Sequence, residues 1–499
     1  MISLVLAAIL LQATPPVPDP ATAGTAPVAK AAAPRAKRAD LGRSYLLLEQ
    51  SLDGRDLTPE RRAEFNRRVD RVAGLFFANR FADAMRLIAE VVAEIEGLDA
   101  EATRAFVAAN LHRAVVDPPV SLATATEPPQ LRLESLANGV TLPPGAKLRI
   151  RPPAGEPTVV EIGAMPVSLP ISLPGRWLGR HEIEIVAGEA VPPVPVGSFQ
   201  VVARDPEGVA GELTARLDAV EGAHPQDVAA VRSRLAILTD APSAAKSVEF
   251  LSDQAELAAA CERDVAALEA GTSPFVGRRD EHWRTVSADA VSIPVRVVAP
   301  PGESLPLVIA LHGAGGDENM FFSGYGNGVL KRLALEKGFV AVTPFTPTFI
   351  ASPLFLDAIV EEIARCYPID RGRILLLGHS LGAGATGSIT ALRPSVPAAI
   401  ACLAGPTPVP VKPLGAGEWP PILACVAELD GVIPAASIRR GIEAGRARGA
   451  DITERSYPDE GHTLVVGTCL PEVIDVLLKA PPRATASGAA ASPAPPTTP

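Results

Sequence analysis

The sequence predicts an α/β fold for the C-terminal part of the chain, preceded by helical segments and a small β-sandwich. From Pro274 onward, short apolar runs alternate with helix-like stretches, which is the pattern of a mostly parallel sheet with helices on both faces. Between about residues 125 and 204, apolar residues come in short alternating pairs separated by Pro and Gly turns, as in the strands of a sandwich. On both sides of that region, apolar residues recur at helical spacing.

Length and composition exclude several classes of protein. A chain of 499 residues has room for two to four domains of ordinary size. Charged residues make up 20% and hydrophobic residues 47%, which excludes a disordered acidic polymer or a coiled coil. With 46 Lys and Arg against 56 Asp and Glu, the net charge is −10, so nothing favours binding to a nucleic-acid backbone.

The N-terminus has the pattern of an export signal. The ten residues Ile2 to Leu11 contain only Ser3 as a polar residue and are followed by the Pro15-Pro16 break. This run fits the core of a signal peptide and is too short to span a bilayer, although no Lys or Arg precedes it. We expect a signal peptide over residues 1–23, a secreted or periplasmic protein, and no stable membrane span.

The rest of the chain divides by composition and spacing. Thr58-Pro59 has the pattern of a helix start, and the Phe and Met stripe that follows is interpreted as core, with nothing that suggests chemistry. The expected divisions are a disordered linker at 24–39, a helical segment at 40–117, a β-sandwich at 120–205, a second helical segment at 206–270, a catalytic domain at 271–479 and a disordered tail at 480–499.

In the third region the expected strands and helices alternate. The strands are expected at Leu307–Leu311, Phe339–Val342, Ile374–Leu377, Ala398–Leu403, Ile422–Val426 and Ile452–Tyr457. The helices are expected near Val329–Lys337, Pro353–Cys366, Ser380–Leu392 and Ala435–Arg448.

The strongest chemical motif is the segment Gly378-His379-Ser380-Leu381-Gly382. It matches G-x-S-x-G between a strand and a helix, the setting of a nucleophile on a tight turn. A side chain at either Gly would collide with that turn. Ser380 is therefore the expected nucleophile, and a serine hydroxyl needs an adjacent base and an oxyanion site.

The base and the acid follow in the chain order of this kind of site. His462 is the only histidine after the motif, in a loop that follows a strand-like run, and Asp430 stands at the end of another strand. The order Ser380, Asp430, His462 predicts a catalytic triad. Glu428 is the fallback acid. His379 is expected to be structural, as are His112, His181, His224 and His282.

An oxyanion hole needs two backbone N–H donors. One is expected from Leu381, the residue after the nucleophile. The second is expected from the segment His312 to Gly316, with Ala314 ahead of Gly313. This Gly-rich segment lacks the Lys-Ser/Thr end of a phosphate-binding loop and the spacing of a dinucleotide motif.

The five cysteines show no C-x-x-C pair and no histidine at metal-ligand spacing, so no metal site is predicted. Four of them lie in the C-terminal third. They can form one or two disulfides in an exported protein or remain buried thiols.

Together these motifs resemble the α/β-hydrolase superfamily over about residues 274–479. Within it the sequence is most similar to a compact serine esterase branch that includes feruloyl and acetylxylan esterases, polyhydroxybutyrate depolymerase-like proteins and dienelactone-hydrolase-like enzymes. The resemblance implies carboxylic ester hydrolysis through an acyl-enzyme, without a metal or organic cofactor. Because only about 20 residues separate Ala404 from the strand at Ile422, it also implies an open site for an extended or polymeric ester. The expected partner is a small-molecule or polymeric ester substrate.

Other assignments remain as expectations. Asn319, Phe321, Phe322 and Tyr325 follow the oxyanion loop and are candidates for the substrate pocket, with simple packing as the alternative. A serine peptidase of the prolyl-oligopeptidase type is one alternative function, although about 80 β residues are too few for a propeller. A non-catalytic binding protein on a hydrolase scaffold is another. The sandwich is a candidate for contact with a polysaccharide.

Overall fold

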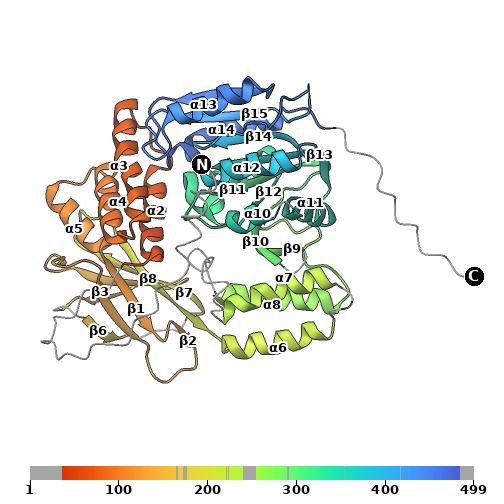
Figure 1. Ribbon diagram of the computed structural model, residues 1–499. Helices are drawn as coiled ribbons and strands as arrows, with labels where there is room; N and C mark the ends of the chain where they lie inside the picture. Colours follow the sequence, from red (N-terminus) through yellow and green to blue (C-terminus); the bar gives the residue numbers. More distant parts are fainter. Residues whose placement is uncertain are drawn as a thin grey trace, which may run out of the picture.

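The computed structural model describes residues 36–163, 167–171, 177–220, 222, 224–239, 254–288, 291–352, 354–415 and 417–483. The expected signal peptide, all but the end of the expected linker and most of the expected tail lie outside these residues. In the described part, no helix combines the length and the apolar character needed to cross a membrane. Figure 1 shows the first group of helices above the β-sandwich and beside the C-terminal domain.

Four helices open the described chain and pack into one layer. They are α2 (Arg38–Leu52), α3 (Pro59–Phe77), α4 (Phe81–Ile95) and α5 (Ala100–Asn110). The Thr58 side chain caps α3, with Pro59 in its first turn. Helix α4 buries Ala84, Met85 and Ile88 along one face.

Two boundaries of the expected helical segment and linker were wrong. Helix α2 begins at Arg38, inside the linker expected at 24–39. At the other end, the helical segment expected to reach residue 117 stops at Asn110, and β1 (His112–Asp117) follows. Along β1 the buried positions alternate with more exposed ones, which is the period of a strand and not of a helix.

The sandwich consists of two sheets. In the first, the antiparallel order is β1, β3 (Gln130–Ser135) and β6 (Val167–Pro170). The second has the order β2 (Val120–Leu122), β8 (Val194–Val202), β7 (Gly179–Val186), β4 (Lys147–Arg151) and β5 (Thr158–Glu161). Their inward side chains share one apolar core with α2 to α5. The sandwich and the first helices therefore form one packed unit.

A second group of helices supports the C-terminal domain from below in Figure 1. It contains α6 (Pro206–Asp218), α7 (Pro225–Leu238) and α8 (Gln254–Glu269). Leu213, Val228 and Leu235 from this group belong to the same apolar core as Val286 and Ile293 of the C-terminal sheet.

The C-terminal domain is built on an eight-stranded sheet with the order β16-β15-β14-β13-β11-β12-β10-β9. Strands β9 and β10 pair antiparallel, as do β10 and β12, and the other neighbours are parallel. The strands are β9 (His282–Ala288), β10 (Val291–Val298), β11 (Leu305–Leu311), β12 (Val340–Pro344), β13 (Ile369–His379), β14 (Pro397–Leu403), β15 (Ile422–Ala427) and β16 (Ile452–Tyr457).

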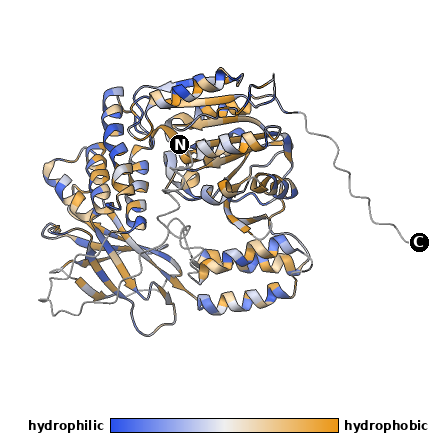
Figure 2. Cartoon of the chain, in the orientation of Figure 1, coloured by the Kyte–Doolittle hydropathy of each residue, from blue (hydrophilic) through white to orange (hydrophobic). Residues whose placement is uncertain are grey.

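Helices cover both faces of this sheet. Helices α9 (Val329–Lys337) and α14 (Val465–Leu478) share a core with one face. The opposite face packs on α10 (Thr346–Ala351), α11 (Leu354–Cys366), α12 (Leu381–Leu392) and α13 (Ala435–Arg446). Figure 2 shows the strands as nearly continuous hydrophobic runs, which is typical of a sheet buried on both sides. All five cysteines are buried free thiols, so the disulfide alternative is not realised.

Candidate active site

Three polar side chains stand at the carboxyl ends of parallel strands. Ser380 follows β13, Asp430 lies just beyond β15, and His462 lies in the loop after β16. Since parallel strands place their carboxyl ends at the same edge of the sheet, residues 32 to 82 positions apart in the chain meet there.

Ser380 occupies a strained turn. Its backbone has φ 55° and ψ −112°, a conformation that L-residues rarely adopt, at the start of α12. A Cβ at Gly378 would lie 2.2 Å from the Gly382 carbonyl oxygen, and one at Gly382 would lie 2.0 Å from the Leu311 carbonyl oxygen. Both glycines are therefore required by close backbone contacts, which hold the serine at the tip of the strand.

The three side chains form a continuous hydrogen-bonded chain. The distance from Ser380 Oγ to His462 Nε2 is 2.9 Å, and His462 Nδ1 lies 2.8 Å from Asp430 Oδ2. The other carboxylate oxygen, Asp430 Oδ1, accepts the N–H groups of Val432 and Ile433 at 2.8 and 2.7 Å. The carboxylate is thereby fixed by its own turn and aimed at the imidazole.

The strand order, with its antiparallel first strands, and the serine on a strained strand-to-helix turn identify the architecture. The C-terminal domain has the α/β-hydrolase fold. In this fold the acid is expected where Asp430 lies. The fallback acid, Glu428, instead pairs with Arg439 and accepts the Ser456 hydroxyl, and the hydrogen bond from Arg439 holds the pKa of its carboxyl below the usual value.

His379 lies behind the hydrogen-bonded chain of Ser380, His462 and Asp430 in this α/β-hydrolase domain. Its Nδ1 is 2.8 Å from the Tyr325 hydroxyl, and its Nε2 is 2.9 Å from the His462 carbonyl oxygen. Burial, together with the neighbouring His462, holds the pKa of His379 well below the usual value, so the ring is neutral. A neutral ring with its proton on Nε2 donates to the His462 carbonyl and accepts from Tyr325, and so supports the base from its backbone side.

The Gly-rich loop after β11 faces Ser380. The N–H of Gly313 donates to the Tyr325 hydroxyl at 3.3 Å, so it is already engaged, which removes Gly313 from the oxyanion candidates. Among the described residues, no hydrogen bond uses the N–H of Ala314 or Leu381. These two donors fit the places at which the sequence expected an oxyanion hole.

Most of the residues expected to line a substrate pocket lie elsewhere. Asn319 is fully buried and is hydrogen-bonded to Asp317, while Phe321 and Phe322 pack in the core beneath α9 and α14. The expectation for these three residues was therefore wrong, because the two phenylalanines pack in the core and Asn319 serves a buried hydrogen bond. Tyr325 does line the cavity described next.

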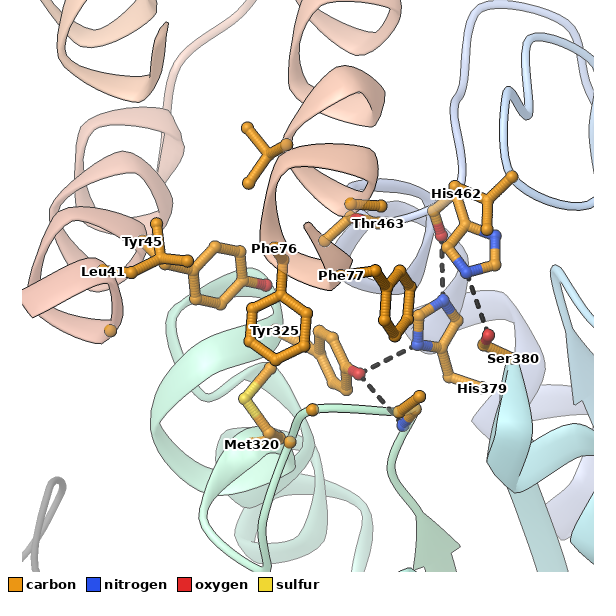
Figure 3. Close-up of a pocket in the computed structure, with 18 of the residues that line it drawn as sticks. Leu41, Tyr45, Phe76, Phe77, Met320, Tyr325, His379, Ser380, His462 and Thr463 are labelled. Carbon is orange, nitrogen blue, oxygen red and sulfur yellow. Dashed lines mark hydrogen bonds between the residues drawn. The ribbon is translucent and has the colours of Figure 1, made fainter. Parts of the chain in front are cut away.

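A cavity of about 180 Å³ opens onto Ser380 and His462. Figure 3 shows that the first helices of the chain contribute much of its wall, with Leu41 and Tyr45 at the end opposite Ser380. The apolar side chains that α2, α3 and α4 place in this wall include Leu41, Val72, Phe76, Phe77 and Ile88. The resemblance implied an open site without a large lid; the structure adds helices from the N-terminal region to the wall of this cavity.

Helix α3 also contacts the loops that carry the triad. Asp70 accepts the His462 N–H at 2.8 Å and the Gly431 N–H at 2.9 Å. One turn earlier, Asn66 accepts the Gly461 N–H at 2.7 Å and donates to the Asp459 carbonyl at 2.9 Å. Sequence reasoning missed both residues. The sequence does contain a pattern that could have indicated them: two polar residues four positions apart on a helix face whose other residues are apolar and expected to be buried.

Solved structures similar to part of the chain include three hydrolases. A thermostable esterase shares 23% identity over 40% of this chain and 63% of its own length, with a TM-score of 0.33. The substrate-bound fluorophosphonate-binding serine hydrolase F of Staphylococcus aureus shares 12% identity over 41% of this chain and 100% of its own, with a TM-score of 0.34. A putative dienelactone hydrolase from Klebsiella pneumoniae shares 17% identity over 40% and 98%, with a TM-score of 0.31.

No protein-family model matches the sequence, and no curated protein matches it.

Proposed function

We propose that this protein is a serine hydrolase that cleaves carboxylic esters by acyl transfer to Ser380. The observation that carries the proposal is the hydrogen-bonded chain from Ser380 Oγ through His462 to Asp430, beside a cavity that a substrate can enter. This is the arrangement that activates a serine hydroxyl at neutral pH.

In the first step, Ser380 Oγ attacks the ester carbonyl while His462 Nε2 takes its proton. Asp430 accepts the Nδ1–H bond and stabilises the imidazolium. The developing oxyanion is bound by the N–H groups of Leu381 and Ala314. These donors are already oriented, so binding the oxyanion requires no reorganisation during the reaction. Collapse of the tetrahedral intermediate breaks the bond to the alcohol, which leaves with the proton from His462, and the acyl group stays on Ser380.

In the second step, water attacks the acyl-enzyme. His462 takes a proton from this water, the same two N–H groups bind the second oxyanion, and the acid product leaves as Ser380 regains its proton. An apolar wall favours an ester over a peptide, because buried peptide N–H and C=O groups would need polar partners. Export through a signal peptide at 1–23 belongs to the same proposal, and sequencing the N-terminus of protein recovered outside the cytoplasm tests it.

The purified protein is reacted with a fluorophosphonate probe beside Ser380→Ala, and both are assayed with p-nitrophenyl butyrate and a matched p-nitroanilide. We expect labelling and ester hydrolysis that disappear in Ser380→Ala, with little anilide cleavage. Preferential anilide cleavage would favour the peptidase alternative. A folded wild-type protein that neither labels nor hydrolyses would overturn the proposal in favour of a binding protein on a hydrolase scaffold.

A further inference from the structure

The wall of the cavity is built mainly by a region outside the α/β-hydrolase domain. Leu41 from α2, Val72 and Phe76 from α3, and Ile88 from α4 present apolar surface to it, and Leu41 and Ile88 are almost completely buried. These side chains reach the cavity from three helices that precede Ser380 by about 300 residues. An apolar wall of this kind gains free energy by contact with an apolar group of the substrate.

Phe76 fixes the position of this wall relative to the reacting carbonyl. A Cβ at Gly315 would lie 2.6 Å from Phe76 Cζ, so the ring rests directly on the loop that contains Ala314. The leaving alcohol has to lie beside His462 Nε2, which protonates it. The end of the cavity marked by Leu41 and Tyr45 lies away from His462 in Figure 3 and is therefore placed to take the acyl group.

The size of the cavity limits that acyl group. An apolar cavity of about 150 Å³ holds one benzene molecule, and the volume here is about 180 Å³. We propose that α2, α3 and α4 form an acyl-binding site for a compact apolar acyl group of about six carbons or one aromatic ring. This inference rests on the proposed function, since it concerns the selectivity of the same serine.

A series of p-nitrophenyl esters from acetate to dodecanoate tests the proposal with two opposing variants. In the wild type, kcat/KM should rise by about 4-fold per methylene up to about six carbons and fall beyond that length. Leu41→Ala enlarges the far end and should move the optimum to longer chains. Ala73 of α3 also lines the cavity, so Ala73→Leu narrows it and should move the optimum to shorter chains. Leu335→Ala, at an exposed position of α9, is the matched control and should leave the optimum unchanged.

Opposite shifts would be difficult to obtain from a general loss of folding. A wild-type profile that stays flat to twelve carbons, or an optimum that neither variant moves, would overturn the acyl-site proposal while leaving ester hydrolysis intact. Absence of labelling and of hydrolysis across the whole series would instead overturn the proposed function.

A second, independent observation concerns Asp70. The residue is 7% exposed, and its carboxylate accepts the N–H groups of both His462 and Gly431, which belong to the loops of the base and the acid. A Cβ at Gly461 would lie 2.7 Å from the same carboxylate, so a glycine is needed for this approach. The two loops are thus held at a common point by one side chain from helix α3.

The geometry points to Asp70 as a positioning residue for the triad. It touches no reacting atom, and it acts by fixing the separation between the loop of Asp430 and the loop of His462. Since misplacement of a catalytic group by about 1 Å can lower the rate by about 10²-fold, its loss should appear in kcat.

Three variants distinguish a role of Asp70 in positioning the triad from a general contribution to the stability of the fold. Asp70→Ala removes both acceptors and should lower kcat by about 10²-fold with KM nearly unchanged. In Asp70→Asn the amide oxygen can take the place of Oδ2, which lies 2.9 Å from both N–H groups, while the amide NH2 at the place of Oδ1 faces the His462 N–H, so kcat should return in part. Arg71→Ala, the exposed next residue on α3, is the control. An Asp70→Ala protein whose melting temperature falls while kcat stays within twofold, or an Asn variant no better than Ala, would overturn this role.

Discussion

The two sides of the cavity are held in place by different interactions. On the triad side, the position of Ser380 is set by the backbone, which has a strained φ of 55°. The neighbouring glycines pack so closely that a Cβ added at Gly382 would lie 2.0 Å from a backbone oxygen. On the helix side, α2 and α3 are held by side chains that accept backbone N–H groups of the other domain, such as Asp70 on His462 and Glu49 on Gly326.

This difference indicates how the site divides its tasks. The backbone side has little freedom, because its contacts are between atoms that no rotamer change can move. The helix side consists of side chains and can change without altering the turn that carries Ser380. We therefore expect substitutions on the first side to abolish chemistry or folding, and those on the second to change selectivity, rate or pH dependence.

The largest effect is expected at the acid of the triad. Asp430→Asn keeps the shape of the side chain but no longer stabilises the imidazolium and favours the wrong tautomer of His462, so kcat should fall by about 10⁴-fold. Steady-state kinetics with p-nitrophenyl butyrate measure this, with circular dichroism to show that the fold is retained.

Glu428→Gln is the matched control for this experiment. Glu428 faces Arg439 and Ser456 at the edge of the sheet, so kcat of the Glu428→Gln variant should stay within a few-fold of the wild-type value. Equal losses at the two positions would contradict the assignment of Asp430 and would remove the distinction between a triad side and its surroundings.

The next largest effect concerns the glycines of the turn. Gly382→Ala forces a Cβ into the Leu311 carbonyl, which should lower the free energy of unfolding by more than about 3 kcal/mol. In the same helix, a Cβ at Gly384 would have Pro406 as its nearest neighbour at 3.9 Å, so Gly384→Ala should stabilise by about 0.5 to 1 kcal/mol. Urea denaturation compares the two, and a tolerated Gly382→Ala would show that the backbone side is less rigid than its contacts indicate.

The same division explains how far the sequence could predict the site. Ser380 could be found because the close contacts of its turn require glycines within two residues of it, which leaves a local motif. The contact of Asp70 with His462 joins residues 392 positions apart, and no local pattern records such a pair. Asn319 was misjudged for the related reason that a polar residue after the oxyanion loop can hydrogen-bond a buried carboxylate, here Asp317, as well as line a pocket.

The fold itself was predictable where strands are buried on both faces. Strands β11 to β15 can be recognised in the sequence as nearly continuous apolar runs, because both faces of the sheet are buried. Strand β1 was missed because its sequence, with three consecutive apolar residues at 114–116 directly after a helix, does not show the alternation that its burial shows. Nothing in the sequence indicated that α2 to α4 lie over the triad, since docking of one region on another depends on surfaces and not on periodicity.

A smaller effect is expected from the pH dependence of the helix side. Burial raises the pKa of Glu49 to about 7, against the hydrogen bonds from Tyr45 and Gly326 and the charge of Arg62, which lower it. The folded state therefore holds a proton that the unfolded chain releases near pH 4.5. The contribution of Glu49 to stability is full below about pH 4.5 and falls by on the order of 3 kcal/mol as the pH rises through 7.

Thermal unfolding at pH 5 and pH 8 tests this for the wild type and Glu49→Gln. The variant cannot titrate at this position, so the difference in melting temperature between the two pH values should shrink. If the difference in melting temperature between pH 5 and pH 8 is the same in the variant, other groups set the pH dependence of stability and Glu49 does not.

The smallest effect is expected at the N-terminus of α3, and it separates the stability of the helix from its role at the site. Thr58 accepts the Arg61 N–H and starts the helix, whereas Phe76 lies eighteen residues further on, about 27 Å along the axis. Thr58→Ala should lower the free energy of unfolding by about 1 kcal/mol or less and leave the acyl-length optimum unchanged. If that optimum moved, selectivity would follow the overall order of α3 and not the side chains that α3 places in the cavity. If Thr58→Ala leaves the acyl-length optimum unchanged while Ala73→Leu shifts it, selectivity depends on the side chains that α3 places in the cavity.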